Sequence, residues 1–262
     1  LSSSGADLIL AIRTLRERFP AALLWTPGLG GPDNAALLVW MGVDLFDSSR
    51  SRIAASHGHL LTMLGPRHLH ESELEDRWIQ EWIDVSHSIR SAIRSGTLRE
   101  LVEMQALNSA SSVEHLRRFD ALLRDEGAPL DRYVAPSRKF RFNAVTSRQD
   151  PLVHDWRRRV SETYTPPIHS SRILLLLPCS ERKPYRESQS HRRFARHILS
   201  NGVDQVMVTS PLGLVPRALE DLWPAAHYDI PVTGDWDLDE LDMIHSMLAR
   251  LVERVGYEKI ID

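Results

Sequence analysis

The sequence predicts an α/β protein, with an α/β part at each end of the chain and a helical part between them. Short apolar segments of strand length alternate with segments of helical periodicity at both ends, and the middle of the chain shows helical periodicity throughout. This alternation is typical of parallel strands joined by crossover helices. The 262 residues are 42% hydrophobic and 26% charged, which is an ordinary globular composition.

The first part contains two predicted strands, at residues 22–26 and 43–46, each preceded and followed by a predicted helix. A loop rich in glycine and proline follows the first strand at residues 27–32. Asp33 and Asn34 then have the residue types that cap a helix. The order of helices and strands, with short links, indicates parallel strands.

The middle and last parts differ in pattern. Residues 71–125 carry three apolar stripes at helical spacing, whereas residues 126–170 contain several prolines and basic runs. Residues 171–262 begin with a strand that is apolar on both faces, as in a buried central strand. We therefore expect four segments: residues 1–70, a helical region 71–125, a linker 126–170, and an α/β core domain 171–262 with a mostly parallel sheet.

The cysteine count and the charge exclude several classes of protein. The only cysteine is Cys179, so an internal disulfide and a zinc site with two thiolates are both impossible. We expect a reducing, cytoplasmic setting, no membrane span, no cofactor and no metal, although the 12 histidines leave a histidine–carboxylate site open. The formal charge of −3 means that nucleic-acid binding would depend on local basic patches. The chain does not begin with methionine, and we expect it to be part of a longer protein.

A run of fixed residues at positions 178–191, PCSERKPYRESQSH, stands out. It resembles the signature P-C-S-x-x-K-P-Y-x-x-S-x-S-H of archaeosine synthases at every fixed position. Residues 210–217 and 228–234 also resemble the core domain of that family. The segment follows the predicted strand at residues 173–177 and precedes a predicted helix at residues 191–200, and ligands in open α/β sheets bind at this edge.

A second resemblance covers roughly residues 1–125. The run GVDLFDS at residues 42–48 and the run GHLLT at residues 58–62 resemble the last strand region of the (β/α)8 barrel of tRNA-guanine transglycosylases. This implies a partial barrel-like remnant that serves as a scaffold or docking surface for tRNA. With only about two βα units, and without the three zinc-binding cysteines of active transglycosylases, base exchange is not expected. Asp44 and Asp47 resemble barrel carboxylates, but capping and strand-end bonding are the favoured roles.

The resemblance implies a transferase in tRNA modification and archaeosine biosynthesis, with a relation to queuine tRNA-ribosyltransferases. In the family reaction, a nitrogen donor is added to the nitrile of 7-cyano-7-deazaguanine at position 15 of archaeal tRNA. The donor is lysine or glutamine; free lysine is favoured, and a partner enzyme then completes archaeosine. The alternative is a catalytically inactive module that docks tRNA for a partner enzyme. A nucleotide-binding hydrolase is disfavoured because the chain has neither a Walker glycine loop nor a Gly-x-Ser-x-Gly elbow.

Three residues of the signature are candidate catalytic residues. The thiolate of Cys179 could attack the nitrile to give a thioimidate, from which an amine displaces the sulfur. Lys183, beside Arg182, could favour the thiolate, and His191 could transfer protons. The alternatives are that Cys179 is buried or only lines the pocket, and that His191 belongs to a helix cap.

The remaining candidates would bind substrate or RNA. The candidate substrate-binding residues are Pro178, Ser180, Tyr185, Ser188, Ser190 and Asp229. Tyr185 could instead pack, Ser188 or Ser190 could cap a helix, and Asp229 could belong to a turn. The candidate RNA-binding residues come from basic clusters and are Arg138, Lys139, Arg192 and Arg193, with Arg196 and residues 157–159 nearby. The alternative for each cluster is a solvated face.

Overall fold

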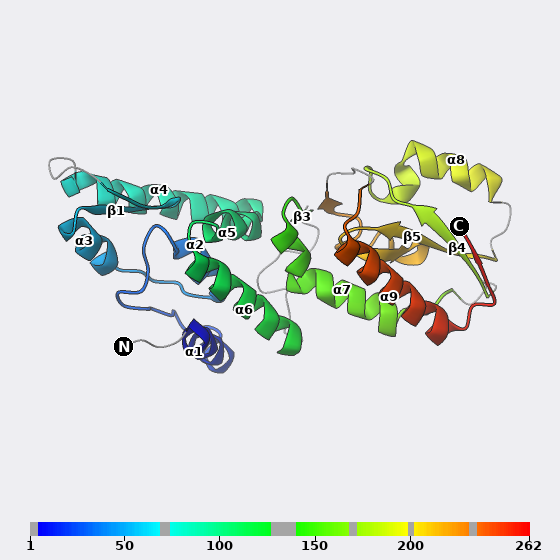
Figure 1. The fold of residues 1–262 in the computed structure, drawn as a ribbon, viewed down its shortest axis with the longest axis horizontal. Coiled ribbons are helices and arrows are strands. Elements are labelled where there is room, and N and C mark those ends of the chain that lie inside the picture. The colour runs from blue at the N-terminus through cyan, green and yellow to red at the C-terminus, as the bar shows by residue number, and fades with distance from the viewer. Residues whose placement is uncertain (1–4, 69–73, 127–139, 168–171, 199–201, 231–234) are drawn as a thin grey trace. The chain divides into compact units, whose positions relative to one another are not determined.

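The structure is a computed structural model that describes residues 5–68, 74–126, 140–167, 172–198, 202–230 and 235–262. It divides into two units, Leu1–Glu126 and Gly127–Asp262, each of which is described by itself (Figure 1). Helices and both parallel and antiparallel strand pairs are present, which confirms the α/β class. The partial barrel and the four-part division of the chain stay predictions.

Unit 1 is mainly helical. Its helices are α1 (Gly5–Arg18), α2 (Ala35–Met41), α3 (Ser49–Ser56), α4 (Leu74–Ser95), α5 (Leu98–Ala106) and α6 (Ala110–Glu126). Almost every side chain of α2 is buried, because this helix is apolar on all sides. Trp40 and Phe119 are among the largest fully buried side chains of the unit. The helices expected between residues 71 and 125 are therefore present as α4, α5 and α6.

The two strands expected in the first 70 residues are reduced to one bridge. Trp25 and Leu45 form an isolated parallel bridge, and the carbonyl of Leu24 accepts hydrogen bonds from Asp44 N at 2.9 Å and Leu45 N at 3.1 Å. Unit 1 also has a short antiparallel hairpin of β1 (His59–Thr62) and β2 (Gly65–His68). Sequence periodicity located the two apolar segments correctly. A strand also needs a neighbouring strand to which its backbone is hydrogen-bonded along its length, and here only the pair Trp25 and Leu45 forms a bridge.

Unit 2 is built on a four-stranded sheet in the order β6-β5-β4-β8. The strands are β4 (Ile173–Pro178), β5 (Asp204–Thr209), β6 (Gly213–Pro216) and β8 (Lys259–Ile261). Strand β4 runs parallel to both β5 and β8, whereas β6 returns antiparallel to β5. The parallel pairing places Pro178 beside Val208, so β4 and β5 end at the same edge. Two residues of β3 (Phe140–Arg141) and β7 (Tyr228–Asp229) form a separate parallel pair.

Three helices accompany this sheet, α7 (Pro151–Glu162), α8 (Gln189–His197) and α9 (Leu238–Val255). Helices α7 and α9 pack on each other and on β6, and α8 lies on the other side of the sheet (Figure 1). Asp237 and Glu240 form a reciprocal capping box at the start of α9, and Gly256 ends it in the left-handed conformation. Short 3-10 turns, η3 (Val145–Gln149), η4 (Tyr185–Glu187) and η5 (Arg217–Leu219), complete the unit.

Helix α7 lies inside the stretch 126–170 that the sequence predicts to be a linker. Its side chains Leu152, Val153, Trp156 and Val160 are buried. The proline at Pro151, which suggests irregular structure, occupies the first turn of the helix, where a missing N–H costs nothing. This part of the stretch is therefore packed structure within unit 2.

No helix in the described part of the chain is both long enough and apolar enough to cross a membrane.

Candidate functional site

The signature segment crosses the carboxyl edge of the sheet in unit 2. Pro178 is the last residue of β4, and Cys179 and Ser180 follow it directly. The chain then forms the turn η4 and enters α8, whose N-cap is Ser188. The Ser188 hydroxyl accepts a hydrogen bond from the backbone N–H of His191 at 3.2 Å and lies 3.1 Å from the Ser190 hydroxyl. The capping role considered for Ser188 is thus observed.

His191 is buried, with 1% of its surface exposed, and both ring nitrogens are bonded. Nε2 lies 2.9 Å from the carbonyl oxygen of Pro178, and Nδ1 lies 2.8 Å from the Arg217 guanidinium. Because a carbonyl only accepts and a guanidinium only donates, these bonds assign the proton to Nε2 and make the ring neutral. Burial, and then the charge of Arg217, lower the pKa of His191. The ring therefore ties α8 to the end of β4.

Arg217 and Glu220 form hydrogen bonds to the signature segment. Neither is among the site residues predicted from the sequence. Glu220 is 2% exposed, and its carboxylate accepts hydrogen bonds from Arg217 Nη1 at 2.9 Å and from the Arg186 backbone N–H at 3.1 Å. Both residues lie in or next to η5, and the residues to which they bond, His191 and Arg186, lie 26 and 34 positions away in the chain. The resemblance at residues 210–217 was the only sequence signal for this support.

Three buried hydroxyl groups meet beneath the segment. The Tyr228 hydroxyl lies 2.7 Å from Thr209 Oγ1 and is hydrogen-bonded to the Tyr185 hydroxyl, which also donates to Thr209 Oγ1 at 3.3 Å. Burial raises the pKa of both tyrosines. Tyr185 is fully buried, which favours packing over stacking on a substrate base.

Lys183 lies above this hydroxyl cluster. Its Nζ atom is 4.3 Å from the centroid of the Tyr228 ring, a cation–π distance. The side chain is half-buried. On either side of it, the Ser180 hydroxyl donates to the Arg182 carbonyl at 3.1 Å, and Arg182 forms an ion pair with Glu187 at 3.0 Å.

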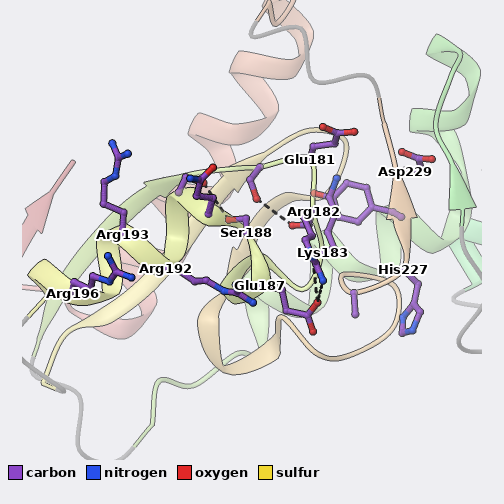
Figure 2. Close-up of a pocket in the computed structure, with 15 residues that line it drawn as sticks. Glu181, Arg182, Lys183, Glu187, Ser188, Arg192, Arg193, Arg196, His227 and Asp229 are labelled. Carbon is purple, nitrogen blue, oxygen red and sulfur yellow. Dashed lines mark hydrogen bonds and ion pairs between the residues drawn. The ribbon is translucent and has the colours of Figure 1, made fainter.

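A large open pocket of about 1400 Å³ lies over the segment. In Figure 2, the three arginines of α8 lie at one end, Asp229 and His227 lie at the other, and Lys183 lies between them. The predicted site residues that line the pocket are Ser180, Lys183, Ser188, Ser190, Arg192, Arg193 and Asp229. Tyr185 and His191 lie buried beneath its wall. Cys179, which is half-buried, and Pro178 do not contribute to the pocket surface.

The basic residues separate into two groups. Arg192, Arg193 and Arg196 are exposed on α8, and none of their guanidinium groups forms an ion pair with a residue that the structure describes. In the triplet at residues 157–159, by contrast, Arg157 donates to the Pro211 carbonyl and the other two arginines pair with Asp155. Arg138 and Lys139 lie outside the described residues.

The two carboxylates of unit 1 that resemble barrel residues serve as loop bonds. Asp44 accepts from Leu24 N at 2.8 Å and pairs with Arg16, and Asp47 accepts from Gly28 N at 2.8 Å. Within the described residues, no three histidine, cysteine or acidic side chains are grouped so that they could hold a metal ion. The candidate site is therefore the pocket of unit 2.

Comparisons with known proteins match nearly the whole chain. The model of a family described as a domain of unknown function, DUF5591, matches residues 153–262. The archaeosine synthase subunit alpha of Thermoplasma acidophilum is 33% identical over 97% of this chain and 49% of its own length. The archaeosine synthase of Methanocaldococcus jannaschii is 34% identical over 93% of this chain and 41% of its own length.

More distant similarity connects the chain to a second group of proteins. The tRNA-guanine(15) transglycosylase of Methanobrevibacter smithii is 27% identical over 86% of this chain and 38% of its own length. A crystal structure of AF0587, a protein of unknown function, aligns with 40% of this chain and 33% of that chain at 31% identity. Its TM-score of 0.31 is too low to inform the fold. By sequence, the chain is related over nearly its whole length to archaeosine synthases, and it spans about half the length, or less, of these two archaeosine synthases.

Proposed function

We propose that this chain acts in tRNA modification, as the part of an archaeosine synthase that adds a nitrogen donor to the nitrile of 7-cyano-7-deazaguanine at position 15 of tRNA. The favoured donor is free lysine, and a partner enzyme would complete archaeosine. The observation that carries the proposal is the pocket, which combines signature residues such as Ser180 and Lys183 with three arginines of α8. We call these three, Arg192, Arg193 and Arg196, the arginine wall. A tRNA substrate also implies a cytoplasmic location.

The charge arrangement of the pocket supports an RNA substrate. The exposed guanidinium groups of Arg192, Arg193 and Arg196 line one end and are suited to bind backbone phosphates. A typical small-molecule pocket has a volume of about 300–1,000 Å³. At about 1400 Å³, this pocket has room for a nucleotide together with a small donor molecule. At its other end, the Asp229 carboxylate is suited to bind the ammonium of an amino acid.

The proposed chemistry has two steps. The Cys179 thiolate forms a bond to the nitrile carbon, and the nitrile nitrogen takes a proton, for which Lys183 is the proposed donor. The amine of the donor then attacks the same carbon, the carbon–sulfur bond breaks to return the thiolate and leave an amidine, and the proton that the amine loses returns to Lys183. Because both nitrogens of His191 are bonded, we assign it a positioning role in this scheme.

The position of Cys179 leaves a second route. The residue does not contribute to the pocket surface, so direct addition of the amine, with Cys179 only supporting the wall, is the alternative. Replacing Cys179 by serine separates the two routes. The covalent route predicts loss of transfer, whereas direct addition predicts that most of the activity remains.

The test uses tRNA that carries 7-cyano-7-deazaguanine at position 15, incubated with the chain and free lysine, followed by nucleoside mass analysis. We expect a mass gain equal to lysine, which is lost in K183A. The control K259R alters a lysine on β8, a strand that contributes nothing to the pocket lining, and should retain the gain. A wild-type chain that binds this tRNA and gives no mass gain would contradict the transferase proposal.

The second candidate function is a docking module that holds tRNA for a partner enzyme. The observation in its favour is the exposed arginine wall on α8. A protein that only binds tRNA would need this surface and no catalytic residues. A docking module would lose tRNA affinity when these arginines are replaced, and K183A would leave that affinity unchanged. A lysine mass gain from the isolated chain would exclude this alternative.

A further inference from the structure

A contact between Lys183 and Tyr228 lies at the centre of the pocket wall. We infer that Tyr228 is a positioning residue that holds the Lys183 ammonium at the pocket, and that Thr209 and Tyr185 fix the Tyr228 ring for this purpose. The inference rests on the proposed function, because it assigns Lys183 a role in the nitrogen transfer. Tyr228 on β7 and Thr209 on β5 lie outside the signature segment, whereas Tyr185 lies within it.

The geometry is that of a cation–π contact. The Lys183 Nζ atom lies 4.3 Å from the ring centroid of Tyr228, well inside the limit of about 6 Å for such contacts. Both residues also line the pocket. An aromatic face orients an ammonium and favours its charged form, so this contact suits a lysine that donates a proton in the pocket.

The Tyr228 ring is fixed on several sides. It is 1% exposed, and its hydroxyl lies 2.7 Å from Thr209 Oγ1 and is bonded to the Tyr185 hydroxyl. Its backbone pairs with Phe140 in the short β3–β7 ladder. The backbone bonds of this ladder are made by the residues beside Tyr228, with Phe140 N donating to His227 O at 2.7 Å and Phe142 N donating to Asp229 O at 3.0 Å. The ring is therefore held by its strand and by its hydroxyl.

The signature segment contacts the same tyrosine twice. Lys183 contacts the ring of Tyr228, and Tyr185, two residues later, bonds to its hydroxyl. Displacement of the Tyr228 ring would therefore disturb both contacts of the segment. Lys183 lines the pocket and Tyr185 does not, but both contact Tyr228, so both contribute to the structure of the pocket wall.

The first experiment detects the contact itself. The chain has three lysines, at positions 139, 183 and 259, so a sample labelled with 13C at lysine Cε gives three assignable signals. The variant K183R identifies the Lys183 signal by its disappearance. Protons above an aromatic face are shielded by the ring, so we expect an upfield Lys183 signal in the wild type. The signal should stay upfield but broaden in Y228F, which keeps the ring and loses its hydroxyl bonds, and should move to the position of the other two lysine signals in Y228L.

The second experiment tests the consequence for the reaction. We expect Y228L to lower kcat by about tenfold because the ammonium is no longer oriented. Y228F keeps the aromatic face but loses both hydroxyl bonds, so it should lower kcat less than Y228L does. The affinity for tRNA should stay unchanged in both variants. T209V removes a hydroxyl bond while keeping the ring, and should broaden the Lys183 signal and lower kcat less than Y228L does.

The outcomes are distinct. A Lys183 signal that Y228L leaves unchanged would overturn the inference, and so would a fall in tRNA affinity that accounts for the whole loss of activity. If Y228L does not fold, as judged by the Lys259 signal, T209V and Y228F replace it. A Lys183 signal that stays sharp and fully shifted in both variants would then overturn the inference. A wild type with the shielded signal and no lysine transfer would refute the proposed function, and with it the catalytic purpose of the contact, while leaving the contact itself established.

Discussion

His191 illustrates how its surroundings restrict the chemistry of a side chain. An exposed histidine is suited to proton transfer near neutral pH. Here the ring is buried, donates to the Pro178 carbonyl and accepts from Arg217, so no ring nitrogen is left for a substrate. The residue type matches the catalytic expectation, but the observed bonds favour a role in holding the strand end in place.

Replacement of Arg217 should change the titration of His191. The variant R217M removes the positive charge beside Nδ1, so we expect the pKa of His191 to rise relative to the wild type. Burial still opposes the charged form, and Glu220, which is bonded to Arg217, stays in place in the variant. Imidazole NMR signals followed against pH measure the change. R217K keeps a positive charge and should show a smaller rise, whereas an unchanged pKa in R217M would contradict the assignment of this bond.

Asp47 should make the stability of unit 1 sensitive to acid. Hydrogen bonds from the Ser49 side chain, and then from the backbone of Gly28 and Ser49, lower the pKa of Asp47 to about 2. The unfolded chain binds this proton at higher pH, with a reference pKa of about 3.9. The stabilisation is therefore complete above this unfolded-state value and is lost as the pH falls toward 2.

The variant D47N should remove this acid sensitivity. Urea unfolding followed at pH 5 and pH 3 should show a smaller loss of stability in D47N than in the wild type. D242N, an exposed change on α9 in the other unit, provides the control of equal charge and should behave as the wild type does. Equal acid sensitivity in all three proteins would contradict the role of Asp47.

At the scale of elements, helix starts account for much of what could be predicted. The long helix α9, Leu238–Val255, has apolar residues at helical spacing and begins at the capping box of Asp237 and Glu240, both of which are readable in the sequence. The apolar run at residues 173–177 predicts strand β4. Helix α7 was missed because its basic residues and Pro151 obscured the apolar face.

The N-cap of α7 gives a prediction for element stability. Asp150 is 3% exposed, and its carboxylate accepts from the Leu152 backbone N–H at 2.9 Å. D150A should lower the free energy of unfolding by about 1 kcal/mol, because the first turn loses its cap. D150N keeps an acceptor oxygen and should lose less. Urea unfolding monitored by tryptophan fluorescence measures both, and equal losses in the two variants would count against the capping role.

At the scale of the whole molecule, charge is distributed unevenly. The formal net charge is −3, with 32 basic and 35 acidic residues. Yet three exposed arginines of α8 line one pocket, and many other arginines are bonded within their own unit. A local patch of this kind supports phosphate binding on a chain that is acidic overall.

The arginine wall should therefore determine how tRNA binding depends on salt. Replacing Arg192, Arg193 or Arg196 by alanine should weaken binding and reduce the slope of log K against log salt by about 0.7–0.9 for each phosphate that the variant no longer neutralises. R250A, an exposed change on α9, is the matched control and should leave the slope unchanged. Binding measured over a series of salt concentrations tests this, and unaltered slopes in all three α8 variants would exclude the wall as the surface that binds RNA.

The sequence by itself determined the α/β class, most helices, the central strands of unit 2 and the segment at residues 178–191. These features depend on local periodicity and on fixed residues close together in the chain. It also indicated several residues of the pocket surface, such as Ser180 and Lys183, because the segment follows a strand at the carboxyl edge of the sheet.

Only the tertiary structure decided which side chains face the pocket and which support it. Tyr185 and His191 lie in the signature yet are buried, whereas Arg217, Glu220 and Tyr228 come from later in the chain and hold the segment in place. The reason is physical. Burial and hydrogen bonding depend on how β4, β5 and the following turns pack together, and contacts across 24 to 43 residues leave no periodic trace in the sequence.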